Sequence, residues 1–171
     1  DWAYSNSNYL LLSAVVERVS GRSLATFAQE RIFAPLGMDR THVHDDCSTV
    51  VKGRALSYAR DARHGYRLDF SSWEQTGDGA VMTTTGDLWK WAQNFQHGRV
   101  GGDALRAAMA APGALDDGRR IDYGTGLVFG SVGDVPTVSH SGAWAGYRAE
   151  LLRVPSLELT VICLCNRGDM D

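Results

Sequence analysis

Apolar positions near the start of the chain recur at the spacing of a helix. In YSNSNYLLLSAVVERVSG, the residues that fall along one side of such a helix are Tyr9, Leu12, Val15, Val16 and Val19. Ser5 or Asn6 can cap the start of this helix, and Gly21 can end it. Ser23 suits the start of a second helix, LATFAQERIF, which we expect Pro35 to stop before a turn at PLGM.

The segment TTTGDLWKWAQNFQHG predicts another helix. Thr85 is its expected cap, Asp87 lies in the first turn, where the helix dipole favours an anion, and Gly98 ends it. Trp89 and Trp91 point to different sides, so we expect protein to cover this helix on more than one side. A further short helix is predicted in DALRAAMAA.

After residue 120 the pattern changes to alternation of apolar and polar positions. The segments DYGTGLVFG, PTVSH, YRAELLRV and LELTVICLC each predict a strand, and PS between the last two predicts a tight hairpin. Residues 41 to about 80 lack a sustained period and predict loops with short strands. Helices followed by an antiparallel meander indicate an α+β fold in which helices pack against a sheet.

Composition restricts the classes of partner. The chain has 171 residues, 44% of them hydrophobic, and a net charge of −3, which suits one globular domain. Lysine occurs only at Lys52 and Lys90, and no basic stripe is present, so nucleic acid is not an expected partner. No apolar run approaches the ~20 residues of a membrane span, and no signal peptide is visible.

The three cysteines do not indicate a disulfide framework, because their number is odd. Cys163 and Cys165 lie two apart in a predicted strand, so their side chains share one face. We interpret them as buried free thiols on the sheet. Metal binding through this C-x-C pair is the alternative.

Four short segments carry most of the functional signal through their order and spacing. They are DWAYSN at the start, PLGM at 35–38, GDGAVMTTTGDL from 77 to 88, and HSG at 140–142. With them, the chain resembles the serine β-lactamase-like hydrolases, a family of class C β-lactamases, DD-peptidases, D-aminopeptidases and esterases. The resemblance runs from Tyr4 to about Asn166. It implies a β-lactamase/DD-peptidase-like α+β fold.

The resemblance implies catalytic roles for three residues. Tyr4 and Asn6 match the Tyr-x-Asn motif of the family, and His140 begins its His-x-Gly motif. A serine hydroxyl needs a base to take its proton. A phenol can be that base where nearby cations stabilise its anion, and a protonated His140 is one such cation. The amide of Asn6 can donate to and accept from a substrate amide.

The remaining implied residues bind the substrate. Ser141 supplies a hydroxyl that contacts it, Gly142 leaves room against the strand edge, and the backbone N–H of Ala143 stabilises the oxyanion. Purely structural interpretations remain open for the motif residues: Tyr4 as a core aromatic, Asn6 as a cap, and the glycines as turn residues.

The Ser-x-x-Lys motif, which holds the nucleophilic serine in this family, does not occur in the chain. We therefore expect residues 1–171 to form a partial β-lactamase-like domain, with a mainly helical region at 1–111 and sheet strands at 120–166. We expect it to be inactive alone and to expose an apolar face and a strand edge. A missing N-terminal segment or self-association would then cover that face. The alternative function is a non-catalytic binding module with a retained pocket.

A rival cluster for metal binding lies in HVHDDC at 42–47. His42 and His44 would share one face of a strand and could hold Zn²⁺. We interpret the segment as a solvated surface loop, and we expect neither a metal nor another cofactor. The expected substrate is a small molecule or short peptide. Because histidine is mostly neutral at pH 7, His140 in place of lysine favours an esterase, aminopeptidase or peptidase over a dedicated β-lactamase.

Overall fold

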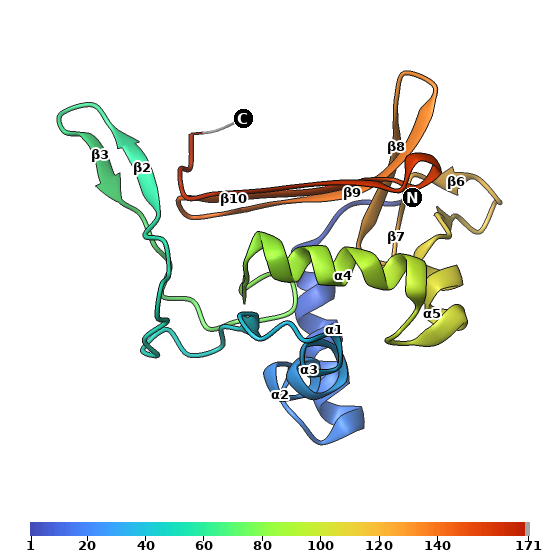
Figure 1. Ribbon diagram of the computed structural model, residues 1–171, viewed down its shortest axis with the longest axis horizontal. Helices are drawn as coiled ribbons and strands as arrows, with labels where there is room; N and C mark the ends of the chain where they lie inside the picture. Colours follow the sequence, from blue (N-terminus) through green and yellow to red (C-terminus); the bar gives the residue numbers. More distant parts are fainter. Residues whose placement is uncertain (170–171) are drawn as a thin grey trace.

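A computed structural model describes residues 1–169 and shows an α+β fold (Figure 1). Its main element is a five-stranded antiparallel sheet in the order β11-β10-β9-β8-β7. The strands of this sheet are β7 (Tyr123–Gly124), β8 (Leu127–Val132), β9 (Val135–Trp144), β10 (Tyr147–Val154) and β11 (Leu159–Cys165). The predicted meander is therefore confirmed, except that DYGTGLVFG forms two strands around a turn at Thr125–Gly126.

The helical region comes first along the chain. Its elements are α1 (Asn6–Ser20), α2 (Leu24–Ala28), the π-helical turn η1 (Gln29–Phe33), α3 (Ala34–Leu36), α4 (Thr85–His97) and α5 (Gly102–Met109). Short strand pairs lie outside the main sheet: β1 (His42–Val43) with β4 (Val81–Met82), β2 (Tyr58–Asp61) with β3 (Gly65–Leu68), and β5 (Gly113–Ala114) with β6 (Arg120–Ile121). A 3-10 turn, η2 (Pro155–Leu157), joins β10 to β11.

Two predicted helix boundaries were wrong. Thr84, not Thr85, caps α4, because its hydroxyl accepts the Asp87 N–H at 3.2 Å. Pro35 lies inside α3 and does not stop it. Gly37 ends that helix in the left-handed conformation, and the π-helical turn before Pro35 provides a different hydrogen-bond register, in which Ala34 bonds back to Gln29.

The hydrophobic core lies within the helical region. It consists of Ala28, Phe33, Leu36, Met38 and Val43, with Ala25, Ile32, Trp91 and Val100 packed against it. Trp91 of α4 faces this core, whereas Trp89 is 46% exposed. The expectation that protein covers α4 on more than one side is nevertheless confirmed, because this helix contacts α3 on one side and β11 of the sheet on another (Figure 1).

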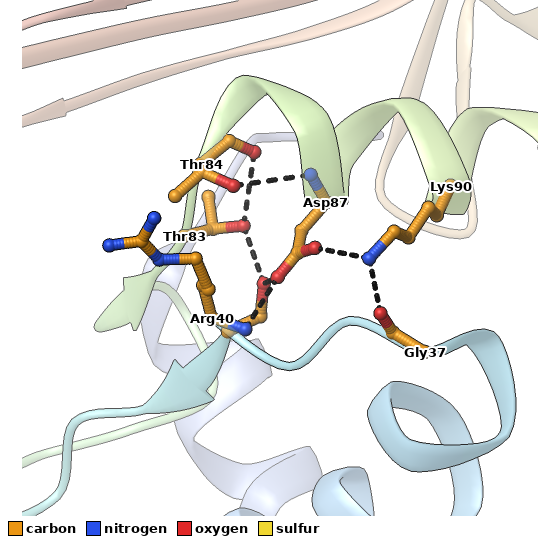
Figure 2. A network of polar contacts seen from close by, with 7 residues as sticks. Gly37, Arg40, Thr83, Thr84, Asp87 and Lys90 are labelled. Atoms are coloured by element: carbon orange, nitrogen blue, oxygen red, sulfur yellow. Dashed lines mark hydrogen bonds and ion pairs between the residues drawn. The ribbon is translucent and has the colours of Figure 1, made fainter.

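A buried carboxylate ties the start of α4 to the segment after α3 (Figure 2). The side chain of Asp87 accepts the backbone N–H of Arg40 at 2.8 Å and the Thr41 hydroxyl at 2.9 Å. Its other oxygen pairs with Lys90 Nζ at 2.9 Å, and Lys90 also donates to the Gly37 carbonyl. Asp87 is only 3% exposed, so this network satisfies a charge that burial alone would disfavour.

The helices all lie on one side of the sheet (Figure 1). Arg153 of β10 shows which residues face them, because its guanidinium stacks on the Phe95 ring of α4 at 4.4 Å. The strand register aligns Arg153 with Thr160, so alternate β11 residues Leu159, Val161 and Cys163 project to the opposite face.

That opposite face has no helix over it within residues 1–169 (Figure 1), and Leu159 and Val161 of β11 are 48% and 49% exposed on it. Cys163 is exposed and Cys165 is half-buried, so the prediction of buried thiols was wrong for Cys163. No residue of α1 is fully buried either. Its exposed apolar residues are Leu11, Leu12, Val15 and Val19. The exposed apolar surface that we expected is therefore present on α1 and β11.

None of the helices in the described residues is long and apolar enough to cross a membrane.

Candidate active site

A cavity of about 150 Å³ lies where the N-terminal segment, α1, a glycine-rich loop and the sheet meet. Its lining combines three phenols, one imidazole and one carboxylate. The lining residues are Tyr4, Tyr9, Gly77, Asp78, Tyr123, Gly126 and His140. Two of the predicted site residues, Tyr4 and His140, thus face the same space although they lie at opposite ends of the chain.

His140 occupies the central strand, β9, opposite Leu151 of β10. Its Nδ1 lies 2.6 Å from the Ser141 carbonyl oxygen, and its Nε2 lies 3.3 Å from the Tyr123 hydroxyl. A carbonyl can only accept, so Nδ1 carries a proton. In the neutral ring Nε2 is then an acceptor that lies near the Tyr123 hydroxyl, whose proton is directed to the Tyr9 oxygen. The Nδ1 contact fixes the tautomer of the neutral ring, and both contacts orient the imidazole.

Tyr123 links the aromatic groups of the cavity. Its hydroxyl is 3.3 Å from that of Tyr9, and its ring meets the Tyr4 ring edge-on at 5.7 Å between centroids. Trp2 packs on it at 5.5 Å. Burial, together with the hydrogen bond that Tyr123 donates to Tyr9, raises the pKa of Tyr123 well above its usual value. Tyr123 is therefore a neutral hydrogen-bonding group at any physiological pH.

Tyr4 lies in the irregular segment just before α1, and its ring centroid is 6.2 Å from that of His140. It is 51% exposed, so one side of the phenol is open. Asn6 is the first residue of α1 and is exposed. It lies outside the wall of the cavity. The segment just before α1 therefore presents the phenol to the cavity, whereas Asn6 at the start of α1 does not line it.

The end of β9 has a free edge. Pairing with β8 stops at Ser139, whereas pairing with β10 continues to Trp144. Ser141, Gly142 and Ala143 lie on this stretch and are exposed. A strand with one unpaired edge offers backbone N–H and C=O groups to an extended ligand. Alternation along β9 directs the Ser141 side chain to the face opposite His140. Ser141 and Ala143 can therefore contribute only backbone groups, on the free edge of the strand, to a ligand in the cavity.

Of the two glycines near the site, Gly142 lies in a strand and Gly146 lies in a turn. Gly142 is within β9, and a Cβ there would only touch Ala149 at 3.6 Å. Gly146 ends the β9–β10 turn, and a Cβ there would lie 2.4 Å from the Tyr58 backbone nitrogen. The close approach at Gly146 is therefore to the protein's own backbone.

Gly77 presses the glycine-rich loop against α1. A Cβ at Gly77 would lie 2.3 Å from the Tyr9 carbonyl oxygen and 2.9 Å from Ser13 Cβ, and its φ of +123° is unfavourable for other residues. We expect Gly77→Ala to lower the free energy of unfolding by about 2 kcal/mol or more, measured by urea denaturation. Gly79→Ala is the matched control, because a Cβ at Gly79 meets no atom within 4 Å. Equal losses in both variants would contradict this account.

Sequence reasoning missed Tyr9, Asp78 and Tyr123. Tyr9 fits the apolar stripe of a helix, and its hydroxyl gives no signal in that pattern. Tyr123 reaches His140 because it is aligned with Val128, and Val128 is aligned with Ser139. Only the register of three strands places these residues together, and no local motif encodes it. Asp78 lies within the segment GDGAVMTTTGDL. The glycines of this segment were the available sign that its backbone packs closely against another element.

The interpretation of 42–47 as a solvated loop holds for Asp45, Asp46 and Cys47, which are exposed, but was wrong for the two histidines. His42 is in β1, and His44 is only 8% exposed, with its N–H bonded to the Ala80 carbonyl at 2.7 Å. The two imidazoles contact each other edge-on at 5.6 Å. Burial and the neighbouring His44 lower the pKa of His42. Within residues 1–169, no group of three or more histidine, cysteine or acidic side chains is arranged to hold a metal ion.

The chain is similar in sequence to proteins of known type. The chain is 32% identical over 181 residues to penicillin-binding protein 4* of Bacillus subtilis, covering 98% of the chain and 40% of that protein. It is 28% identical to the D-aminopeptidase of Brucella ovis, over 96% of the chain and 32% of that protein. The chain therefore spans well under half of the length of these curated relatives.

Solved structures show the same fold. The octameric penicillin-binding protein homologue from Pyrococcus abyssi superposes with a TM-score of 0.85 at 24% identity, over 98% of the chain and 39% of that protein. D-amino acid amidase from Ochrobactrum anthropi SV3 gives 0.77 at 22% identity, over 97% and 50%. The expected fold, and its partial character, are thus confirmed. Since the Beta-lactamase family model matches residues 1–171, the whole length of the sequence, the chain belongs to the beta-lactamase family.

Proposed function

We propose that the chain is part of a serine hydrolase that cleaves an amide or ester through an acyl-enzyme. The observation that carries this proposal is the shared cavity of Tyr4 and His140, with ring centroids 6.2 Å apart. The nucleophilic serine comes from a segment outside these 171 residues, because the chain has no Ser-x-x-Lys motif. Alone, the chain is therefore inactive. The substrate is a small molecule or a short peptide, and the reaction uses no cofactor.

Each group has a defined task in this reaction. Tyr4 takes the proton of the serine and returns it to the leaving group. His140 borders the same space and, when protonated, stabilises the phenolate. Asn6 holds the substrate amide. The substrate backbone lies along the free edge of β9 at Ser141 and Gly142, where the Ala143 N–H donates to the oxyanion.

Covalent labelling tests this proposal. We expect a fluorophosphonate to label one serine, outside residues 1–171, in a polypeptide that carries this chain together with its upstream segment. The chain alone should remain unlabelled, and Ser141→Ala should not change the labelling of the longer polypeptide. Mass spectrometry of the labelled peptide identifies the serine. Stoichiometric labelling within the chain itself, or at Ser141, would overturn the proposal.

A non-catalytic binding module is the second candidate, and the absence of the Ser-x-x-Lys motif favours it. It predicts that the upstream segment contains no serine that a fluorophosphonate can label, although the cavity still binds ligands. The labelling experiment therefore distinguishes the two functions.

We also propose that the exposed apolar residues of α1 and β11 are covered in the working protein, by the upstream segment or by another copy. Val19 is 82% exposed and Val161 49% exposed, which is costly for side chains of this type. The octameric state of the Pyrococcus abyssi homologue is compatible with self-association.

A further inference from the structure

Asp78 carries the one full negative charge in the wall of the cavity. Its neighbours there are the phenols of Tyr4, Tyr9 and Tyr123 and the imidazole of His140, with glycine at the two remaining positions. Within residues 1–169, no lysine or arginine lines this space. A cavity with this wall attracts a cation and repels a carboxylate.

The position of Asp78 is set by the backbone. Gly77 packs on the Tyr9 carbonyl and on Ser13, so the loop has no room to shift toward α1. Asp78 is half-buried at the cavity. Some aspartates of the described chain are paired with a cation: Asp87 pairs with Lys90, and Asp169 pairs with Arg167. No ion pair within residues 1–169 includes Asp78.

The aromatic neighbours suit the same kind of ligand. The faces of tyrosine rings carry negative electrostatic potential and attract an ammonium group, the more so where water is displaced. A primary ammonium also donates three hydrogen bonds, which a carboxylate and phenol oxygens can accept. The Tyr4 and His140 rings border the same space, so a cation held there lies next to the groups that we assign to the reaction.

We propose that Asp78 is a specificity-determining residue that binds the free ammonium group of the substrate. The substrate class is then an amide or ester of an amino acid or short peptide whose amino group is unblocked. This inference rests on the proposed function for the bond that is cleaved, but the recognition of the ammonium group is a separate property of the cavity. Substrates with a carboxylate at this position bind poorly.

Paired ligands that differ only in this charge test the proposal. The protein is the polypeptide that carries this chain with its upstream segment, and the probes are phenylalanine p-nitroanilide and its N-acetyl derivative, as both enantiomers. We expect kcat/KM to favour the free amine by about tenfold or more. Asp78→Asn should remove most of this preference, because it should lower kcat/KM for the free amine much more than kcat/KM for the acetylated compound.

Two further variants sharpen the result. Asp78→Glu keeps the charge and should retain part of the preference. Asp103→Asn changes an aspartate with a 93% exposed side chain on α5 and should have no effect. Equal losses with both substrates in Asp78→Asn would overturn the proposal, because they would show that the carboxylate serves another group of the protein.

A binding measurement separates this inference from the proposed function. Phenylalanine amide and N-acetylphenylalanine amide are titrated into the same polypeptide and its Asp78→Asn variant, with calorimetry as the readout. Preferential binding of the free amine that is lost in Asp78→Asn supports the role of Asp78 even if no substrate is hydrolysed. Equal affinity for the two amides in the wild-type protein overturns it, whatever the hydrolytic activity.

Discussion

Replacing Tyr4 by phenylalanine is expected to lower kcat/KM by a factor of about 10² to 10⁴ in the polypeptide that combines this chain with its nucleophilic serine. The substitution removes one oxygen atom and leaves the ring, which still packs edge-on against Tyr123. Tyr4 is half-exposed and forms no part of the hydrophobic core, so the fold should be unaffected. The loss would therefore report the missing proton acceptor.

The measurement is hydrolysis of a chromogenic ester together with the rate of fluorophosphonate labelling. Both should fall in Tyr4→Phe, because the base acts when the serine is acylated. Tyr66→Phe is the matched control: it makes the same change on the exposed β2–β3 hairpin, far along the chain from the cavity. If Tyr4→Phe kept more than a tenth of the wild-type rate, another group would have to be the base.

Replacing Asp87 by alanine is expected to cost about 3 kcal/mol of the free energy of unfolding. The change leaves the Arg40 N–H, the Thr41 hydroxyl and the Lys90 ammonium without their shared acceptor. Natural domains are stable by only about 5–15 kcal/mol, so this is a large fraction of the total. Urea denaturation followed by circular dichroism measures it.

Acid should produce the same effect in the wild-type protein. Burial raises the pKa of Asp87, but hydrogen bonds from Lys90, Arg40 and Thr41 outweigh it, so that the pKa lies below its usual value of 3.8. The folded state thus binds the proton more weakly than the unfolded state does. The stabilisation is complete well above pH 4 and disappears as the pH falls through the lowered pKa. Asp87→Asn should reduce this acid sensitivity.

The control for Asp87→Ala is Asp103→Ala. Asp103 also lies in the first turn of a helix and pairs with a cation three residues later, but its side chain is 93% exposed. Its loss should stay within about 0.5 kcal/mol. Similar losses for the two variants would mean that the buried network contributes no more than an ordinary surface pair.

The parts of the fold that could be predicted from sequence depend on local chemistry. The end of α1 at Gly21 and the start of α2 after Ser23 follow from caps, which need only a few neighbouring residues. Likewise β9, β10 and β11 follow from alternation. Thr84 and Thr85 are chemically the same, so the cap of α4 depended on which hydroxyl meets the Asp87 N–H. The path of the backbone, and not the composition, decides that contact.

The site could be predicted only where a motif fixes residue types at short spacing. Tyr4 and His140 were found in this way, and the structure brings them to one cavity. Tyr123 and Asp78 reach it through the pairing of β7, β8 and β9 and through the packing of Gly77 on α1. Contacts between residues so far apart in the chain produce no periodic pattern in the sequence. They could therefore be identified only from the three-dimensional structure.

The position of the cavity between the two ends of the chain has a consequence for biosynthesis. The ribosome releases Tyr4 and α1 early, but β9, which carries His140, only after most of the chain has been made. The residues of the helical core are therefore synthesised before β9, which forms part of the cavity wall. Bringing such distant segments together is among the slow steps of folding, because the chain loses conformational entropy before stabilising contacts form. A cell that degrades incomplete chains would thus remove molecules that could never bind or cleave anything.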